Sequence, residues 1–188
     1  MLFRSWMHCD FITIEGEKIS KSLGNTYSLA ELSDRGFSAM DYKMWVLSGH
    51  YQGTRNFTFE SLEGARARRL NWRNRIAECY QGATGSSFDF NAVLEAVNNN
   101  LGSPEAFALI DGASLSLVDW KKVDELFGLR LISDSPDIDD ETHQLIEERQ
   151  KVRTEKNFAR ADEIRDLLAK KGITVKDTEN GPVWQYLV

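Results

Sequence analysis

The pattern of hydrophobic and polar positions changes along the chain from short β-like runs to helical spacing. Near the start, residues 11–14 (Phe-Ile-Thr-Ile) form a brief β-prone run that ends at Gly16. A Lys/Ser-rich loop at 18–25 follows. A lone strand beside a loop has no partner for its backbone, so we expect this segment to be the end of a larger unit.

Helical signals then dominate. Ser28 with Glu31, and Ser38 with Asp41, have the spacing of capping boxes and predict two short helices joined by a turn. Apolar residues at helical spacing predict a small bundle beyond them. Its helices are expected at 60–80, 88–101, from 103 onward and 117–127.

The tail has its own pattern. An acidic stretch around Pro136 precedes two helical segments, the second running from Asn157 to Gly172 with Phe158 counted in its apolar stripe. Two β-prone runs at 173–176 and 183–187 flank an Asn180-Gly181 turn. The tail is therefore predicted to hold two helices and a hairpin.

Composition limits the class of protein. The 188 residues are 41% hydrophobic with short apolar runs, so a membrane span is not expected and the cytoplasm is the expected location. The net charge of −6 disfavours a nucleic-acid binder that acts by charge alone, although 66–75 is locally rich in arginine. Cys9 and Cys79 lack the spacing of a zinc site.

The sharpest chemical signal is Lys18-Ile19-Ser20-Lys21-Ser22. Two lysines on a loop hinged by Gly16 and Gly24 can neutralise a triphosphate as pyrophosphate leaves. A solvated loop without chemistry is the alternative.

This loop, residues 18–25, is here called the signature loop. It resembles the Lys-Met-Ser-Lys-Ser signature of class I aminoacyl-tRNA synthetases, with Ile19 in place of methionine. Other short stretches, in family order, are similar to cysteinyl-tRNA synthetases. They are residues 6–8 (Trp-Met-His), 15–17 (Glu-Gly-Glu), 48–51 (Ser-Gly-His-Tyr), 103–106 (Ser-Pro-Glu-Ala), 127–129 (Phe-Gly-Leu) and 158–167, followed by Gly172-Ile173, Asp177-Thr178, Gly181 and Trp184.

The resemblance implies a mainly α fold. It would comprise the end of a class I catalytic core with stem-contact helices, an anticodon-binding helical bundle, and a small C-terminal α+β piece with a hairpin. The boundaries expected are 1–58 for the core end with the signature loop, 59–132 for the helical domain, 133–140 for an acidic linker and 141–188 for the mini-domain.

The resemblance also implies the chemistry, which is ATP-dependent attachment of cysteine to its tRNA. Lys18 and Lys21 would be catalytic, and with Ser20 and Ser22 they would bind ATP, which enters with Mg as a substrate. We expect tRNA(Cys) to contact two sets of residues. These are Arg66, Arg69 and Arg73, spaced along one face of the long helix, and Lys156, Arg160 and Trp184 in the tail.

Two family elements have no counterpart here, the His-x-Gly-His element that binds ATP and the zinc site that selects cysteine. His8, His50 and His143 are far apart in the sequence, so no metal site is expected, and zinc is expected only in an N-terminal part absent from this chain. We therefore expect the C-terminal part of a cysteine–tRNA ligase, inactive alone, with a separately encoded N-terminal half as a candidate partner.

Two other interpretations stay open. A free-standing tRNA-binding module without catalysis fits the tail and the bundle. A relative of mycothiol cysteine ligase fits the signature loop and residues 48–51, but such proteins lack the stretch from Gly172 to Trp184.

Overall fold

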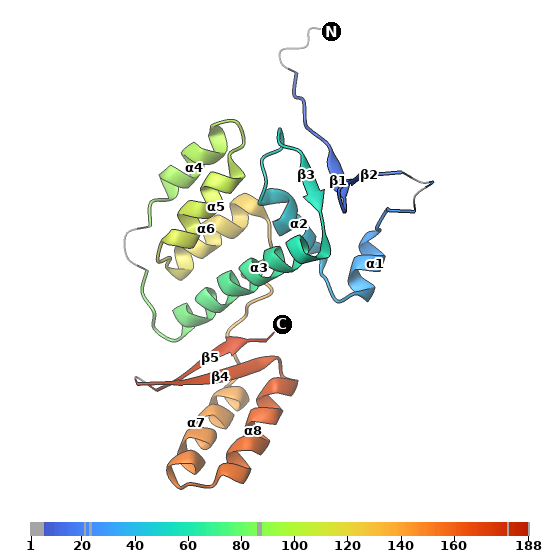
Figure 1. Cartoon of the computed structure of the whole chain (residues 1–188). Coiled ribbons are helices and arrows are strands. Elements are labelled where there is room, and N and C mark those ends of the chain that lie inside the picture. Colours follow the sequence, from blue (N-terminus) through green and yellow to red (C-terminus); the bar gives the residue numbers. More distant parts are fainter. Residues whose placement is uncertain (1–5, 21, 23, 86–87, 180, 188) are drawn as a thin grey trace. The chain divides into compact units, whose positions relative to one another are not determined.

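Helices dominate the chain, as the expected fold class requires (Figure 1). The computed structural model describes residues 6–20, 22, 24–85, 88–179 and 181–187. The chain divides into two compact units, residues 1–69 with 87–113 and residues 70–86 with 114–188. The four parts expected from the sequence do not coincide with this division and stay a prediction. Within the described ranges, no helix is both long and apolar enough to cross a membrane.

A three-stranded sheet opens the first unit. Strand β1 (Ile12–Ile14) pairs antiparallel with β2 (Glu17–Lys18) and parallel with β3 (Arg55–Phe57), in the order β2-β1-β3. The expectation that the first strand has no partner is therefore wrong. The parallel neighbour comes from 43 residues further on, with Thr13 opposite Asn56. Parallel strands need a long crossover, which the next two helices supply.

The crossover helices are α1 (Leu29–Asp34) and α2 (Ala39–Leu47). Both predicted capping boxes are confirmed, because each N-cap serine accepts a hydrogen bond from the third helical residue and that residue's carboxylate accepts one from the serine N–H. Met44 and Trp45 of α2 are fully buried, which attaches this helix to the unit's core.

Helix α3 (Phe59–Tyr80) contributes residues to both units and confirms the predicted long helix. Leu62 and Ala65 are buried in the first unit, and Trp72 and Ile76 in the second. These four residues, at helical spacing, therefore form the buried face of the helix.

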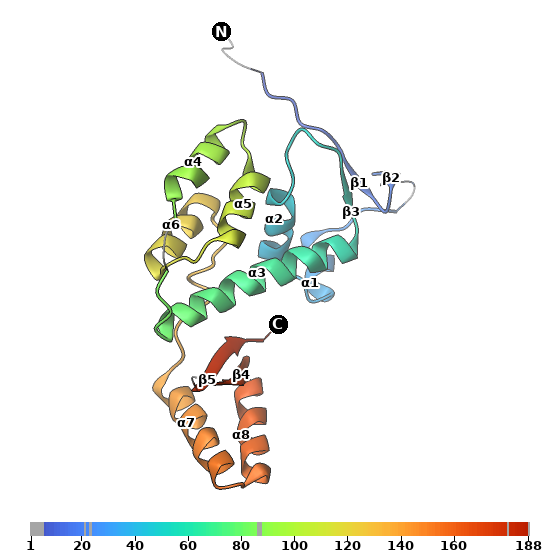
Figure 2. The same cartoon turned by 60° about the vertical axis from the view of Figure 1, so that its left-hand side comes forward.

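A helix pair completes the first unit. Helices α4 (Phe90–Asn98) and α5 (Ser103–Gly112) lie side by side (Figures 1 and 2). The helix predicted at 88–101 is shorter at both ends. Asp89 caps its start, and Asn100 and Leu101 adopt left-handed φ angles of 56° and 55° that end it.

The second unit contains α6 (Leu117–Phe127), whose predicted bounds are confirmed and whose stop is Gly128 at φ 58°. The acidic linker expected at 133–140 stays a prediction, and two of its residues contact the second unit. Ser135 is fully buried, and Asp139 caps the helix that follows. These contacts hold the segment against the unit.

The tail forms the predicted pair of helices and hairpin. Helices α7 (Asp140–Thr154) and α8 (Phe158–Lys170) precede the antiparallel strands β4 (Ile173–Thr178) and β5 (Gly181–Tyr186). Asn180 of the predicted turn lies outside the described residues. The core of this region also takes in Ala77 of α3. Its other buried members are Ile146, Ile164, Leu168, Ile173, Trp184 and Tyr186.

Candidate functional site

The signature loop begins at the end of strand β2. Lys18 is the last residue of that strand, lies opposite Thr13 of β1, and is exposed. The Ser20 and Ser22 hydroxyl oxygens are 2.7 Å apart, and the Ser22 N–H donates to the Ser20 hydroxyl at 3.3 Å. Lys21, the other predicted catalytic lysine, lies outside the described residues. The described part of the loop therefore presents one ammonium group and two coupled hydroxyls.

The side chain of Asn25 bridges the start of the signature loop. Its amide nitrogen donates to the carbonyl oxygen of Lys18 at 3.1 Å, and its amide oxygen accepts from the N–H of Ser20 at 2.9 Å. No role for Asn25 follows from the sequence motifs described above. The sequence signal that could have indicated it is an asparagine directly after Gly24. In the structure Gly24 adopts a left-handed φ of 62°.

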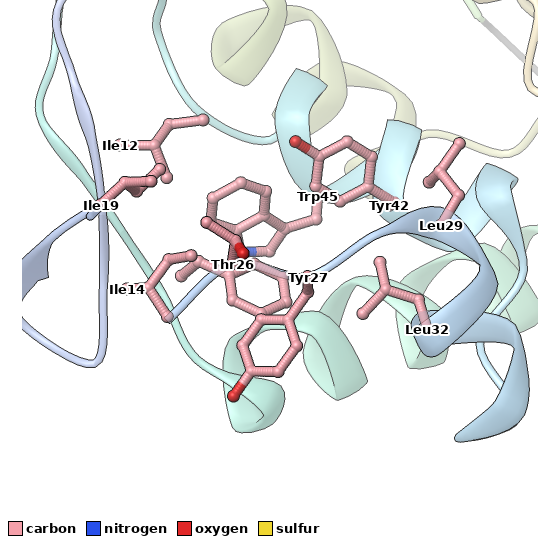
Figure 3. Close-up of a pocket in the computed structure, with 10 residues that line it drawn as sticks. Ile12, Ile14, Ile19, Thr26, Tyr27, Leu29, Leu32, Tyr42 and Trp45 are labelled. Carbon is pink, nitrogen blue, oxygen red and sulfur yellow. The ribbon is translucent and has the colours of Figure 1, made fainter. Parts of the chain in front are cut away.

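An apolar pocket of about 280 Å³ lies beside the loop. Ile19 of the signature loop lines it together with Ile12 and Ile14, and Figure 3 shows these three on one side of the pocket. Its remaining lining is Thr26, Tyr27, Leu29, Leu32, Tyr42, Trp45 and Phe57. The indole N–H of Trp45 donates to the Ser61 hydroxyl at 2.8 Å. A lining without cations does not suit a phosphate, so this pocket is not a candidate anion site.

The predicted arginine stripe does not form one exposed surface. Arg69 is only 6% exposed and lies 3.5 Å from the Asp41 carboxylate, so its role in the fold is to pair with a buried charge. Arg66 lies 3.6 Å from Glu63 and over the Phe37 ring. Arg66 keeps partial access to solvent, whereas Arg69 does not.

Arg73 is in the second unit. Its Nε donates to the Ser135 hydroxyl at 3.2 Å, and its guanidinium carbon lies 4.7 Å from the centre of the Tyr186 ring. The pKa of the Tyr186 phenol is raised, and burial is the largest cause. The contacts of Arg73 are therefore those of a residue that docks the hairpin.

The two tail cations predicted to bind RNA lie where α7 meets α8. Lys156 is exposed in the turn between them, and Arg160 is in the first turn of α8. Arg160 pairs with Glu163 at 3.0 Å and Glu148 at 2.9 Å, and these hydrogen bonds raise its pKa. Phe158, which lies between the two cations in the sequence, is 62% exposed. This corrects its assignment to the apolar stripe.

Trp184 does not form part of that exposed surface. It is 2% exposed, and its ring meets that of Tyr186 edge to face at 5.3 Å. Stacking of Trp184 on an RNA base would require an accessible ring, whereas the ring is packed against that of Tyr186. An aromatic at the start of a helix beside two cations is the signal that points to Phe158.

The histidines and cysteines do not gather. Among the described residues, no group of three or more His, Cys, Asp or Glu side chains is placed to hold a metal ion. His50 instead contacts the carbonyl oxygen of Asn100 at 2.9 Å. The Cys79 thiol donates to the carbonyl oxygen of Arg75, and burial raises its pKa. The described histidines and cysteines therefore do not come together in the way that a zinc site requires.

Comparison with known proteins places two stretches of the chain. Residues 1–67 match the catalytic domain of class I (C) tRNA synthetases, and residues 135–184 match the anticodon-binding domain of cysteinyl-tRNA ligase. The cysteine–tRNA ligase of Chlamydia caviae is 32% identical over 95% of this chain and 44% of its own length. That of Borrelia hermsii is 32% identical over 94% of this chain and 44% of its own. The cysteine–tRNA ligase of Treponema denticola is 29% identical over 97% of this chain and 46% of its own length. The chain spans less than half the length of these curated relatives.

Proposed function

The chain belongs to the cysteine–tRNA ligase family, and we propose that it supplies the signature loop for cysteine activation and the parts that hold tRNA(Cys). The substrates in this proposal are cysteine, ATP with Mg, and the tRNA. Cysteine is joined to AMP with release of pyrophosphate, and the cysteinyl group then passes to the tRNA. The proposal includes a cytoplasmic location, where protein synthesis would use this activity.

One observation carries the proposal. The two family matches stand in the order catalytic, then anticodon-binding, and the first contains an exposed Lys18 beside the paired hydroxyls of Ser20 and Ser22. A relative of mycothiol cysteine ligase is disfavoured, because the second match is to the tRNA-binding part of the tRNA enzyme.

The ammonium group of Lys18 offsets negative charge that grows on the phosphates as pyrophosphate leaves. The Ser20 and Ser22 hydroxyls donate hydrogen bonds to phosphate oxygens. Lys21 has the same role by its place in the signature sequence. Removing one transition-state contact of this kind lowers the rate by about 100- to 1,000-fold.

RNA contacts in this proposal come from Lys156, Arg160 and Phe158 in the tail, with Arg66 in α3. Lys156 binds a phosphate, and the exposed Phe158 ring stacks on an unpaired base, a contact of about 1–3 kcal/mol. Arg69, Arg73 and Trp184 are not included, because their contacts and burial commit them to the fold.

Pyrophosphate exchange with cysteine tests the catalytic part. It would be measured on the chain alone and with a polypeptide carrying the first half of a relative's ligase. We expect exchange in the combined sample, a loss of about 100-fold in Lys18→Ala, and unchanged tRNA binding by that variant. Exchange that survives Lys18→Ala at full rate would contradict the role of the loop.

Selective binding of tRNA(Cys) by the chain, measured by filter retention, tests the RNA part. Equal affinity for unrelated tRNAs would contradict it. RNA binding without exchange in either sample would instead favour the free-standing tRNA-binding module.

A further inference from the structure

We propose that Asn25 is a positioning residue for the signature loop, because its side chain sets the backbone that carries Lys18 and Ser20. The proposal rests on the proposed function of that loop and adds a residue to it. It concerns only the described residues on either side of Ile19.

The side chain of Asn25 binds the backbone of the loop in the way that a neighbouring strand would bind it. In an extended segment, the carbonyl of one residue and the N–H of the residue two positions later point to the same side. Asn25 meets both of these groups, at Lys18 and at Ser20, through its single amide (3.1 and 2.9 Å). The backbone is therefore held extended past the end of β2, as a neighbouring strand would hold it.

The residue between them lies against an apolar surface. Ile19 lines the apolar pocket with Ile12 and Ile14 (Figure 3). Side chains alternate in an extended segment, so Lys18 and Ser20 project away from the pocket. Two hydrogen bonds with Asn25 and the apolar contact of Ile19 thus define where the loop begins and which way its functional side chains face.

Asn25 also keeps the hydroxyl pair in place. The N–H of Ser20 is bound by Asn25, and the Ser20 hydroxyl accepts from the N–H of Ser22. Without the amide, rotation of the backbone at Ser20 moves both hydroxyls relative to the Lys18 ammonium. A displaced contact no longer matches the phosphate oxygens, and precise placement is the main source of stabilisation in phosphoryl and adenylyl transfer.

The same sheet provides a matched control. The side-chain oxygen of Asn56 accepts from the N–H of Gly16 at 2.7 Å and the hydroxyl of Thr13 at 3.1 Å. It binds a backbone N–H in the turn between β1 and β2, as Asn25 does in the loop. Replacing either asparagine by alanine removes two hydrogen bonds, so comparable losses of stability are expected.

The test is a titration of the full chain with magnesium tripolyphosphate, followed by the amide NMR signals of Ser20 and Ser22. We expect saturable shifts in the wild type, at least fivefold weaker binding in Lys18→Ala and Asn25→Ala, and wild-type affinity in Asn56→Ala. Hydrogen exchange of the Ser20 amide should accelerate only in Asn25→Ala, and that of Gly16 only in Asn56→Ala.

The outcomes separate the two claims. If Lys18→Ala weakens binding but Asn25→Ala binds like the wild type, the positioning role is wrong and the function of the loop stands. Equal weakening in Asn25→Ala and Asn56→Ala shows general destabilisation and also overturns the role. If the wild type shows no shifts, or Lys18→Ala binds as well as the wild type, the proposed function of the loop fails and the role of Asn25 fails with it.

Discussion

The side-chain amide of Gln81 pairs with both backbone groups of Trp184. Its nitrogen donates to the Trp184 carbonyl oxygen at 3.0 Å, and its oxygen accepts from the Trp184 N–H at 2.9 Å. Seven residues earlier, the amide oxygen of Asn74 accepts from the N–H of Tyr186 at 2.8 Å. The free edge of β5 is thus covered by amide side chains that follow or belong to α3, which satisfies an otherwise open strand edge.

We expect Gln81→Ala to destabilise the second unit by about 1–3 kcal/mol, because two backbone groups lose their partner. Urea unfolding and hydrogen exchange of the Trp184 amide would measure this. Gln185→Ala, on the other face of β5, serves as the control and should change stability by less than about 0.5 kcal/mol. Unchanged exchange at Trp184 in Gln81→Ala would contradict the interpretation.

The pair of Arg149 and Asp177 makes stability depend on pH. Arg149 is 5% exposed and forms two hydrogen bonds with the Asp177 carboxylate, at 2.9 and 3.1 Å. The pKa of Asp177 lies below its ordinary value, and the hydrogen bond from Arg149 is the largest cause. A lowered folded-state pKa gives stability that is present above the unfolded pKa, near 4, and is lost as pH falls through the folded pKa.

Asp177→Asn should therefore lower stability at pH 7 and flatten its decline below about pH 4. Because the Asp177 side chain is nearly half exposed, we expect only about 1–2 kcal/mol. Thermal melts from pH 3 to 7 measure both effects. Asp162→Asn, which removes an exposed pair with Arg165, is the control and should retain the wild-type slope. A wild-type slope in Asp177→Asn would refute the linkage.

Substitutions of two aromatic residues in the tail should affect RNA binding and stability separately. Phe158→Ala should weaken tRNA binding by about 1–3 kcal/mol while the melting temperature stays within a few degrees, because its ring is exposed. Trp184→Ala should instead cost about 3–5 kcal/mol of stability, because a buried side chain is removed. Leu167→Ala, an exposed apolar change on the same helix, is the control for Phe158. Equal RNA affinity in Phe158→Ala and Leu167→Ala would rule out stacking by Phe158.

Salt dependence tests the cation beside that ring. Lys156→Ala should reduce the slope of log affinity against log salt by about 0.7–0.9, the amount for one phosphate contact. Arg69→Met should leave the slope unchanged, because Arg69 is buried beside Asp41. Filter binding at four salt concentrations gives both slopes. An unchanged slope in Lys156→Ala would exclude it from the RNA surface.

Local signals in the sequence predicted most helices. Gly128 ends α6 where the sequence predicts, and the N-cap serines of α1 and α2 each pair with a residue three positions later. These interactions form between near neighbours, so their spacing is visible in the chain itself. The signature loop was found for the same reason, since its functional residues are consecutive.

Long-range contacts decided what the sequence analysis missed. Strand β1 finds its parallel neighbour in β3, and Trp184 is buried by contacts that include Gln81, 103 residues earlier. Arg69 was expected on an RNA surface from its helical spacing. Such spacing shows which residues share a face of a helix, but it does not show what that face contacts. Asp41, which pairs with Arg69, is 28 residues away in another helix.

Gly49 lies close to the side chain of Arg55, the first residue of β3. The guanidinium of Arg55 donates to the carbonyl oxygens of Trp45 and Val46 and lies over the Trp45 ring, so it caps the C-terminus of α2. A Cβ added to Gly49 would lie 2.3 Å from Cδ of Arg55. Gly49 therefore leaves the space in which this cap is formed.

Gly49→Ala should cost about 1.5–3 kcal/mol, the usual contribution of hydrogen bonds to a charged group, because the arginine must leave its cap. Arg55→Ala should cost a similar amount. In the double variant the alanine at 49 should add less than about 0.5 kcal/mol, since the side chain that it displaces is already gone. Urea unfolding of the four proteins gives the coupling, with Gly53→Ala, whose Cβ would meet only the His50 carbonyl oxygen at 3.6 Å, as the tolerated control. Additive losses would show that Gly49 is needed for some reason other than Arg55.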